Sequence, residues 1–217
     1  MMMKAEQEAE QARNNITPRT AAVILAGGQA RRLNGQNKSG LMVGSKSCLE
    51  RVFESVKEPV DAIALSVGKT DRYNHAQHHE IIFDWPSAAD ESGAIFAVLG
   101  SLDWAKKTGY DAVITTPVDT PFLPNDYVQR LMKKGPHLRP AVCKTPEGLQ
   151  GLHALWPVSC FEPLKTAVLE NSIYKLSKIH KVLGSKEVTI SADEAWTFLN
   201  INNEAALQAA RDLALSS

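Results

Sequence analysis

The segment VILAGGQARRLNGQNKSGLM, residues 23–42, joins an apolar run to two adjacent glycines and then to several cations. With the two alanines before it, the apolar run at 21–25 is typical of a strand that is buried on both faces of a sheet. Gly27 and Gly28 lack a β-carbon, so the chain can turn there and a ligand can come close to the backbone amides. The segment therefore predicts a buried strand whose exit loop can bind an anion.

The cations of this loop are Arg31, Arg32 and Lys38. The common phosphate-binding patterns do not account for them, because the loop contains neither GxxxxGK followed by Ser or Thr nor GxGxxG. From the glycines alone, a tight strand exit with solvated arginines is an equally good interpretation. The combination of glycines, paired arginines, Gly35 and a lysine is what favours an anion site.

The chain has 217 residues, of which 44% are hydrophobic, and its 24 basic residues balance 24 acidic ones. We expect a flexible polar leader over residues 1–18 and a single domain over residues 19–217. A formal charge of zero creates no net field that would recruit nucleic acid or an anionic membrane. The apolar runs are too short to span a bilayer and no secretory signal is visible, so we expect a cytoplasmic protein.

The cysteines are Cys48, Cys143 and Cys160. They are odd in number and show no CxxC spacing, so neither a disulfide framework nor a zinc site is indicated. We expect them to be small buried side chains.

Apolar runs and helical spacing alternate along the chain. Runs of apolar residues predict strands at 21–25, 61–67, 80–84, 111–119, 139–145, 149–156 and 186–190. Apolar residues that recur every three or four positions predict helices at 47–57, 94–107, 125–134, 159–172 and 174–184, and a last one after residue 202.

Repeated strand, loop and helix units imply parallel pairing, so the expected fold class is α/β, a doubly wound and mostly parallel Rossmann-like sheet. The runs at 139–145 and 149–156 surround a turn and predict a small antiparallel edge in the second half. Ligands of open α/β sheets bind beyond the carboxyl ends of the strands, where the strand order reverses. The residues that follow the strands are Leu25 to Lys38, Ser66 to Gly68, Asp84, Asp119 and Asn200 to Asn202.

Three motifs together resemble the molybdenum cofactor guanylyltransferases, a branch of the MobA-like nucleotidyltransferases. They are LAGGQARRLNGQNKSGLM at 25–42, PVDTPFLP at 117–124 and NIN at 200–202. Each motif alone is modestly specific, and the resemblance rests on their order and spacing over about residues 20–210. It implies a nucleotidyltransferase domain that transfers GMP from GTP to molybdopterin, releases pyrophosphate and forms the guanine dinucleotide cofactor.

The resemblance implies a role for each position of the first motif. It places Arg32 and Lys38 on the phosphates of GTP, and these two and Asp119 are the expected catalytic residues. Charge grows on the phosphate oxygens during displacement at the α-phosphorus, so positioned cations are the main catalytic resource. The other nucleotide-binding residues that it implies are Leu25, Ala26, Gly27, Gly28, Ser66 and Asp84.

The resemblance also implies Mg²⁺, held by Asp119. A hard divalent cation prefers oxygen ligands, and one carboxylate with substrate phosphates is often sufficient. Asn202, or Asn200 as the weaker alternative, is expected to add a neutral oxygen. The alternative roles are structural: an aspartate that caps a turn, and an asparagine that holds the turn before the last helix.

On the base side, Asp84 matches an aspartate that contacts the guanosine part of GTP. Its carboxylate could accept from guanine N–H groups or from ribose hydroxyls, and the sequence leaves both open. A loop-entry aspartate without a ligand is the alternative. Ser66 stands where some relatives have asparagine.

The second half of the chain corresponds to the pterin side of the family. His153 in this half is a candidate pterin contact and equally a packed strand histidine. Trp85 and Trp156 could stack on a flat pterin ring, although aromatic residues in strands and turns more often belong to the core.

Asn37 departs from the family pattern, which has an aspartate before the lysine. With Ser66, it motivates a second hypothesis, a cofactor-binding homologue with weak or no catalysis. A third hypothesis keeps the chemistry but uses CTP, or a sugar phosphate as the acceptor. The partners implied by the leading hypothesis are GTP, molybdopterin or Mo-molybdopterin, and molybdoenzyme apoproteins or chaperones that receive the product.

Overall fold

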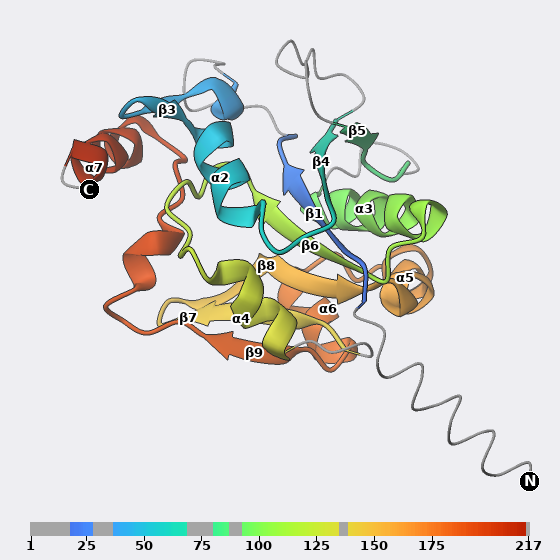
Figure 1. The fold of residues 1–217 in the computed structure, drawn as a ribbon. Coiled ribbons are helices and arrows are strands. Elements are labelled where there is room, and N and C mark those ends of the chain that lie inside the picture. The colour runs from blue at the N-terminus through green and yellow to red at the C-terminus, as the bar shows by residue number, and fades with distance from the viewer. Residues whose placement is uncertain (1–17, 28–36, 69–79, 87–92, 135–138, 216–217) are drawn as a thin grey trace, which may run out of the picture.

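The computed structural model describes residues 18–27, 37–68, 80–86, 93–134 and 139–215. Within these ranges, one sheet has the strand order β5-β4-β1-β6-β8-β7-β9, and β2 and β3 form a separate hairpin (Figure 1). The strands are β1 (Thr20–Leu25), β2 (Met42–Val43), β3 (Lys46–Ser47), β4 (Ala62–Val67), β5 (Glu80–Phe83), β6 (Ala112–Pro117), β7 (Ala141–Thr145), β8 (Gly148–Pro157) and β9 (Lys186–Thr189).

Helices pack on both faces of the sheet. The α-helices are α2 (Cys48–Val56), α3 (Ala94–Thr108), α4 (Tyr127–Lys134), α5 (Phe161–Lys165), α6 (Leu176–Val182) and α7 (Glu204–Leu215). The shorter helical turns are η1 (Lys38–Gly40), η2 (Val158–Cys160), the π-helical η3 (Thr166–Glu170) and η4 (Ala195–Phe198). No described helix is long and apolar enough to cross a membrane.

The expected doubly wound, mostly parallel α/β fold is confirmed. Strands β5, β4, β1 and β6 run parallel to one another. The expected antiparallel part is the hairpin of β7 and β8, in which β8 also pairs antiparallel with β6. Strand β9 pairs in parallel with β7 and forms the outer edge, so the hairpin lies inside the sheet.

The strand order reverses beside β1. From β1 the chain winds outward through β4 to β5, and it then crosses to β6 on the other side of β1. The strand order therefore reverses between β1 and β6, and the loops after these two strands diverge from the same edge of the sheet. This is the position at which open α/β sheets bind their ligands.

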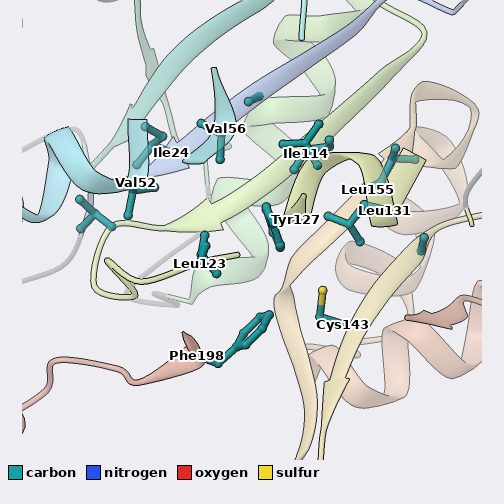
Figure 2. Packing of buried hydrophobic residues seen from close by; sticks show 14 of the residues in the cluster. Ile24, Val52, Val56, Ile114, Leu123, Tyr127, Leu131, Cys143, Leu155 and Phe198 are labelled. Carbon is teal, nitrogen blue, oxygen red and sulfur yellow. The ribbon is translucent and has the colours of Figure 1, made fainter. Parts of the chain in front are cut away.

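Alternation along β1 assigns its residues to two cores. Ala22 and Ile24 belong to the core that α2 and α4 cover, whereas Ala21 and Val23 face the opposite side, where α3 packs. Figure 2 shows the first core, in which sheet residues meet Val52 and Val56 of α2 and Tyr127 and Leu131 of α4. The second face of the sheet is covered by α3, α5 and α6. Helices therefore cover both faces of the sheet, as near-continuous apolar strands require.

The expected helices and strands are found within a few residues of their predicted bounds. The segment before Asn200 contains the 3-10 turn η4. Its buried residue Phe198 packs into the core of α4 instead of pairing with a sheet edge. The three cysteines are buried and unpaired, as expected.

Candidate active site

Three side chains from distant parts of the chain meet at one ammonium group. The Nζ atom of Lys38 lies 2.6 Å from Oδ2 of Asp119 and 2.6 Å from Oδ1 of Asn202. Lys38 is only 19% exposed and Asp119 14% exposed, so this ion pair is partly shielded from water. The expected convergence of Lys38 and Asp119 is confirmed, and Asn202, not Asn200, makes the contact.

The turn η1 holds Lys38 in place through its own capping residue. Asn37 accepts a hydrogen bond from the amide of Ser39 at 3.0 Å through its side-chain oxygen, and its carbonyl accepts from Gly40. An N-cap requires a side-chain oxygen and not a charge, so asparagine serves here as well as aspartate does. Asp119 and Asn202, and not residue 37, orient the ammonium of Lys38.

Backbone contacts fix the carboxylate of Asp119 at the end of β6. The amide of Val118 donates to the carbonyl of Leu25 at 3.1 Å, which extends the pairing of β1 and β6 past the strand ends. The amide of Ile201 donates to the carbonyl of Asp119 at 2.9 Å. Atom Oδ1 of Asp119 is buried and has no hydrogen-bond partner among the described residues. Within that part of the chain, Lys38 is therefore the group that compensates the charge of this carboxylate.

The residue after Asp119 is braced from the neighbouring strand. The hydroxyl of Thr120 donates to the carbonyl of Pro117 and lies 2.9 Å from Nε2 of His153 on β8. Burial lowers the pKa of His153 to about 3, so its imidazole is uncharged at neutral pH. His153 packs edge-on against Tyr127 and Phe198. Of the two roles expected for it, the packed strand histidine is the one observed.

The thiol of Cys48 is buried close to this site. Burial, assisted by the charge of Asp119, raises the pKa of Cys48 to about 11. Cys48 is the first residue of α2, whose N-terminus is closed by a capping box between Ser47 and Glu50. A buried thiol that is protonated at neutral pH is a poor nucleophile.

The first amides of the glycine loop are already paired. The backbone amides of Ala26 and Gly27 both donate to the carbonyl of Ser66, at 2.8 and 3.1 Å. The pairing of β1 with β4 thus continues into the loop and engages the Gly27 amide, and the contact of Gly27 with the nucleotide stays a prediction. Gly28, Arg31, Arg32 and Gly35 lie outside the described residues.

Ser66 and Asp84 form a pair at the ends of β4 and β5. The hydroxyl of Ser66 donates to Oδ1 of Asp84 at 2.8 Å. Ser66 is completely buried, whereas Asp84 is half-buried. Ser66 therefore orients the carboxylate of Asp84.

Helix α3 presses closely against the loop that carries Asp84. A β-carbon on Gly100 would collide with the carbonyl of Phe83 and would lie 3.0 Å from the amide of Trp85. That amide donates to the carbonyl of Phe96 at 2.9 Å. Glycine at position 100 is thus required by the close approach of the helix to the backbone around Asp84.

The tryptophans expected as possible pterin contacts have structural roles. Trp156 is completely buried, donates to the hydroxyl of Thr115 and stacks on His180. Trp85 is half-buried and packs edge-on against Phe161 at 5.5 Å. The exposed tryptophan among the described residues is Trp196 of η4, which is 48% exposed.

The described residues provide few protein ligands for a metal. Among them there is no group of three or more His, Cys, Asp or Glu side chains that could hold a metal ion. The oxygens of Asp119 and Asn202 nevertheless converge on one cation, the Lys38 ammonium, and such hard oxygens suit Mg²⁺. A metal bound here would complete its coordination with water and substrate phosphates.

Residues 22–187 match the family of MobA-like NTP transferase domains. The molybdenum cofactor guanylyltransferase of Acidiphilium cryptum is 34% identical over 194 residues, which are 87% of this chain and 92% of that protein. The enzyme of the same name from Rhodopseudomonas palustris is 31% identical and covers 91% of this chain and 94% of its own. The chain belongs to the molybdenum cofactor guanylyltransferase family.

Solved structures have the same fold as this guanylyltransferase family member. The molybdopterin-guanine dinucleotide biosynthesis protein A of Archaeoglobus fulgidus superimposes with a TM-score of 0.68 at 22% identity, over 91% of this chain and all of that one. The 2-C-methyl-D-erythritol 4-phosphate cytidylyltransferase of Thermus thermophilus gives 0.67 at 14% identity, over 92% of this chain and all of its own. The chain is thus a nucleotidyltransferase of molybdenum cofactor biosynthesis on a fold that also serves a cytidylyltransferase.

Several contacts of this guanylyltransferase site could not be found from the sequence. The bond between Thr120 and His153 has no local signature, because the two residues are 33 positions apart. The contact between Phe122 and Trp196, whose ring centroids lie 6.0 Å apart, has no local signature in the sequence either. The available signal was that Phe122 lies in the motif of Asp119 and that Trp196 shortly precedes the motif of Asn202.

Proposed function

We propose that this protein transfers GMP from GTP to the phosphate of molybdopterin or Mo-molybdopterin, with Mg²⁺, and that Lys38 and Asp119 are central to the transfer. An oxygen of the pterin phosphate forms a bond with the α-phosphorus of GTP, and the bond from that phosphorus to the bridging oxygen breaks. The bond electrons leave with pyrophosphate. The observation that carries the proposal is the convergence of Lys38, Asp119 and Asn202 at the switch point of the sheet.

Asp119 and Asn202 are the residues that would hold the metal. Mg²⁺, when bound, supplies positive charge that neutralises oxygens of the triphosphate. Support comes from the donor set, a carboxylate and an amide oxygen that already share a cation within 2.6 Å. Because the described residues offer no larger ligand cluster, we propose that the metal arrives with the nucleotide phosphates.

Lys38 supplies a mobile positive charge beside the reacting phosphate. An ammonium group is a compact point charge on a flexible stem, so it can follow charge as it moves to the leaving oxygens. We propose that Arg32 adds a second cation on the phosphates, as the resemblance implies. The loop from Leu25 to Gly28 carries the nucleotide, with Gly28 and Arg32 outside the described residues.

Asp84 is the proposed contact to the guanosine part of GTP. Its carboxylate accepts from Ser66 through Oδ1, and this bond fixes the direction of the group. Guanine presents two adjacent N–H donors, which suit a carboxylate acceptor that is held still. We propose that Ser66 positions Asp84 and contributes to binding through it.

We propose that the pterin ring lies toward Phe122 and Trp196. Phe122 follows Asp119 by three residues, and Trp196 precedes Asn202 by six, so both rings are attached to the segments that carry the proposed metal ligands. Trp196 is 48% exposed and contacts Phe122, which gives the edge of this segment an aromatic surface. Flat heteroaromatic rings stack favourably on such surfaces.

The direct test is incubation of the protein with labelled GTP, Mg²⁺ and molybdopterin, followed by detection of pyrophosphate and the dinucleotide. Both products are expected, and neither should form when any one component is omitted. Absence of both products with Mg²⁺ and with Mn²⁺ would contradict the proposal. An apoenzyme or chaperone that accepts the dinucleotide can then be sought by transfer of the labelled product.

Base preference separates the leading hypothesis from the CTP alternative. The relatives named guanylyltransferase, at 31% and 34% identity, favour GTP. A ligand at about a hundredfold its dissociation constant adds roughly 2.7 kcal/mol of stability. With Mg²⁺ present, GTP should raise the unfolding temperature and CTP at the same concentration should not.

The alternative hypothesis is a carrier, that is, a cofactor-binding homologue with weak or no catalysis. One of the two observations behind it is weakened, because Asn37 caps η1 without a charge. We therefore expect Asn37→Asp to change the transfer rate by less than about threefold, since either side chain can accept from an N-cap amide. A large gain in rate would instead mark the natural protein as a weakened enzyme. Bound pterin without turnover in either form would support the carrier.

A further inference from the structure

We propose that Lys38 occupies the place of the metal on Asp119 and Asn202 in the free protein, and that the triphosphate of the nucleotide opens this place by drawing the ammonium away. Divalent metal and nucleotide then bind as a linked pair, with little metal binding before the nucleotide arrives. This inference rests on the proposed function, because it concerns the same two oxygens.

The contacts of the ammonium are those that a metal would need. Two donors of Lys38 are directed at Oδ2 of Asp119 and Oδ1 of Asn202, each 2.6 Å away. Magnesium binds oxygen at about 2.0 to 2.1 Å, so a metal on these two atoms would stand where the ammonium stands now. The two cations cannot share this position.

Burial keeps a cation in solvent away from the second carboxylate oxygen of Asp119, Oδ1. Oδ1 of Asp119 has almost no exposed surface and no hydrogen-bond partner among the described residues. A cation that comes from solvent must therefore approach through Oδ2, which Lys38 covers. The side-chain oxygen of Asn202 is engaged by the same ammonium.

The charge balance explains why the nucleotide would release the site. Lys38, Asp119 and Asn202 together carry no net charge, so a divalent cation added to them meets no excess of negative charge. A triphosphate offers Lys38 several anionic oxygens in exchange for one shared carboxylate, and charge-assisted hydrogen bonds to phosphate are strong. Once the ammonium has moved, Asp119 is an uncompensated, partly buried carboxylate, which favours metal binding.

A site that is open in only a fraction of the molecules binds with an affinity reduced by that fraction. Removing the lysine should therefore strengthen metal binding by the free protein, although it weakens catalysis. We expect Lys38→Met to bind Mn²⁺ at least about tenfold more tightly than the wild type when no nucleotide is present. Methionine keeps an unbranched apolar stem of nearly the length of lysine without its charge.

The experiment measures free Mn²⁺ by electron paramagnetic resonance during titration of the full chain. Wild type, Lys38→Met and the matched control Lys46→Met are compared without nucleotide. Lys46 is a suitable control because it pairs with Glu54 on the surface, at 2.7 Å, and takes no part in the site. The proposal requires tighter Mn²⁺ binding by Lys38→Met alone, and equal binding by all three proteins would overturn it.

A second measurement uses the wild type alone, so the proposal can still be tested if Lys38→Met folds poorly. The rise in unfolding temperature is recorded with Mn²⁺ alone, with a nonhydrolysable GTP analogue alone, and with both. We expect almost no rise with Mn²⁺ alone and a joint rise that exceeds the sum of the separate ones. A joint rise equal to that sum contradicts the linkage while leaving the proposed function intact, whereas no response to the nucleotide under any condition contradicts the proposed function itself.

Discussion

The backbone amide of Ile201 donates to the backbone carbonyl of Asp119 across 2.9 Å. This bond fastens the segment before α7 to the end of β6, and it sets the side chains of Asp119 and Asn202 beside each other. Because the bond uses only backbone atoms, a substitution of the Asp119 side chain leaves it in place. The chemistry of the site can therefore be altered without removing the tie that assembles it.

Asp119→Asn should lower the rate of metal-dependent transfer by about 100-fold or more, because a neutral amide cannot replace the carboxylate on the metal. The measurement is pyrophosphate release at saturating GTP and molybdopterin. Asp126→Asn is the matched control, since Asp126 pairs with Arg130 on the exposed side of α4. Asp119 has no catalytic role if the two variants are equally active.

Ser66→Ala should raise KM for GTP by about tenfold and change kcat little, because a hydrogen bond to a charged group contributes roughly 1.5 to 3 kcal/mol and this one orients Asp84. Ser101→Ala removes another fully buried serine, whose hydroxyl donates to Ala97 within α3. The two variants should lose similar stability. If KM for GTP rises equally in both, Ser66 does not act through Asp84.

Gly100→Ala should destabilise the fold by about 1 to 3 kcal/mol and weaken GTP binding, because the new methyl group would push α3 away from the backbone at Trp85. Chemical denaturation and nucleotide titration measure the two effects. Gly93→Ala is the control, since among the described residues its methyl carbon would meet Ile95 alone, at 4.0 Å. A Gly100→Ala protein that binds GTP like the control would show that the helix does not set the position of Asp84.

The buried histidines predict a loss of stability in acid. Burial lowers the pKa of His153 to about 3 and also lowers the pKa of His180. The unfolded chain takes up a proton on each near pH 6.5, whereas the folded chain does not, so stability falls as the pH decreases from about 6.5 toward the folded pKa values. For His153 this amounts to roughly 1.4 kcal/mol per pH unit.

His153→Gln should therefore show a shallower loss of unfolding free energy between pH 7 and pH 5 than the wild type, by about 2 kcal/mol over the interval. Glutamine can still donate to Thr120, so the brace beside Asp119 is retained. Denaturant titrations at several pH values measure the slope. Identical slopes in the two proteins would show that folding does not lower the pKa of His153.

Trp196→Ala should raise KM for molybdopterin by about tenfold and leave the affinity for GTP unchanged, because a stacking contact is lost on the acceptor side only. Tyr110→Ala removes an aromatic ring at the opposite end of β6, where it packs on Trp104. This control should leave both substrates unaffected. An unchanged KM for molybdopterin in Trp196→Ala would remove Trp196 from the acceptor site.

The elements that could be predicted are those whose signal is local. The apolar run of β1, the helical spacing of α2 and α3 and the strand of β6 each lie within one short window, and the structure contains all of them. The convergence of Lys38 and Asp119 followed from a general property of parallel sheets, whose carboxyl ends share one edge. The family motifs added the identity of the ligand, which composition alone does not contain.

The sequence by itself determined the alternation of strands and helices, and with it the edge of the sheet at which a site can form, because side-chain periodicity encodes local structure. Only the tertiary structure decided that Asn202 reaches Lys38 from 164 positions away, that Ser66 turns to Asp84, and that Trp156 is buried while Trp196 is exposed. These outcomes depend on how packed layers bring distant segments into contact. No short window of residues carries that information, since a tryptophan or a serine has the same local pattern whether its neighbours in space are core or solvent.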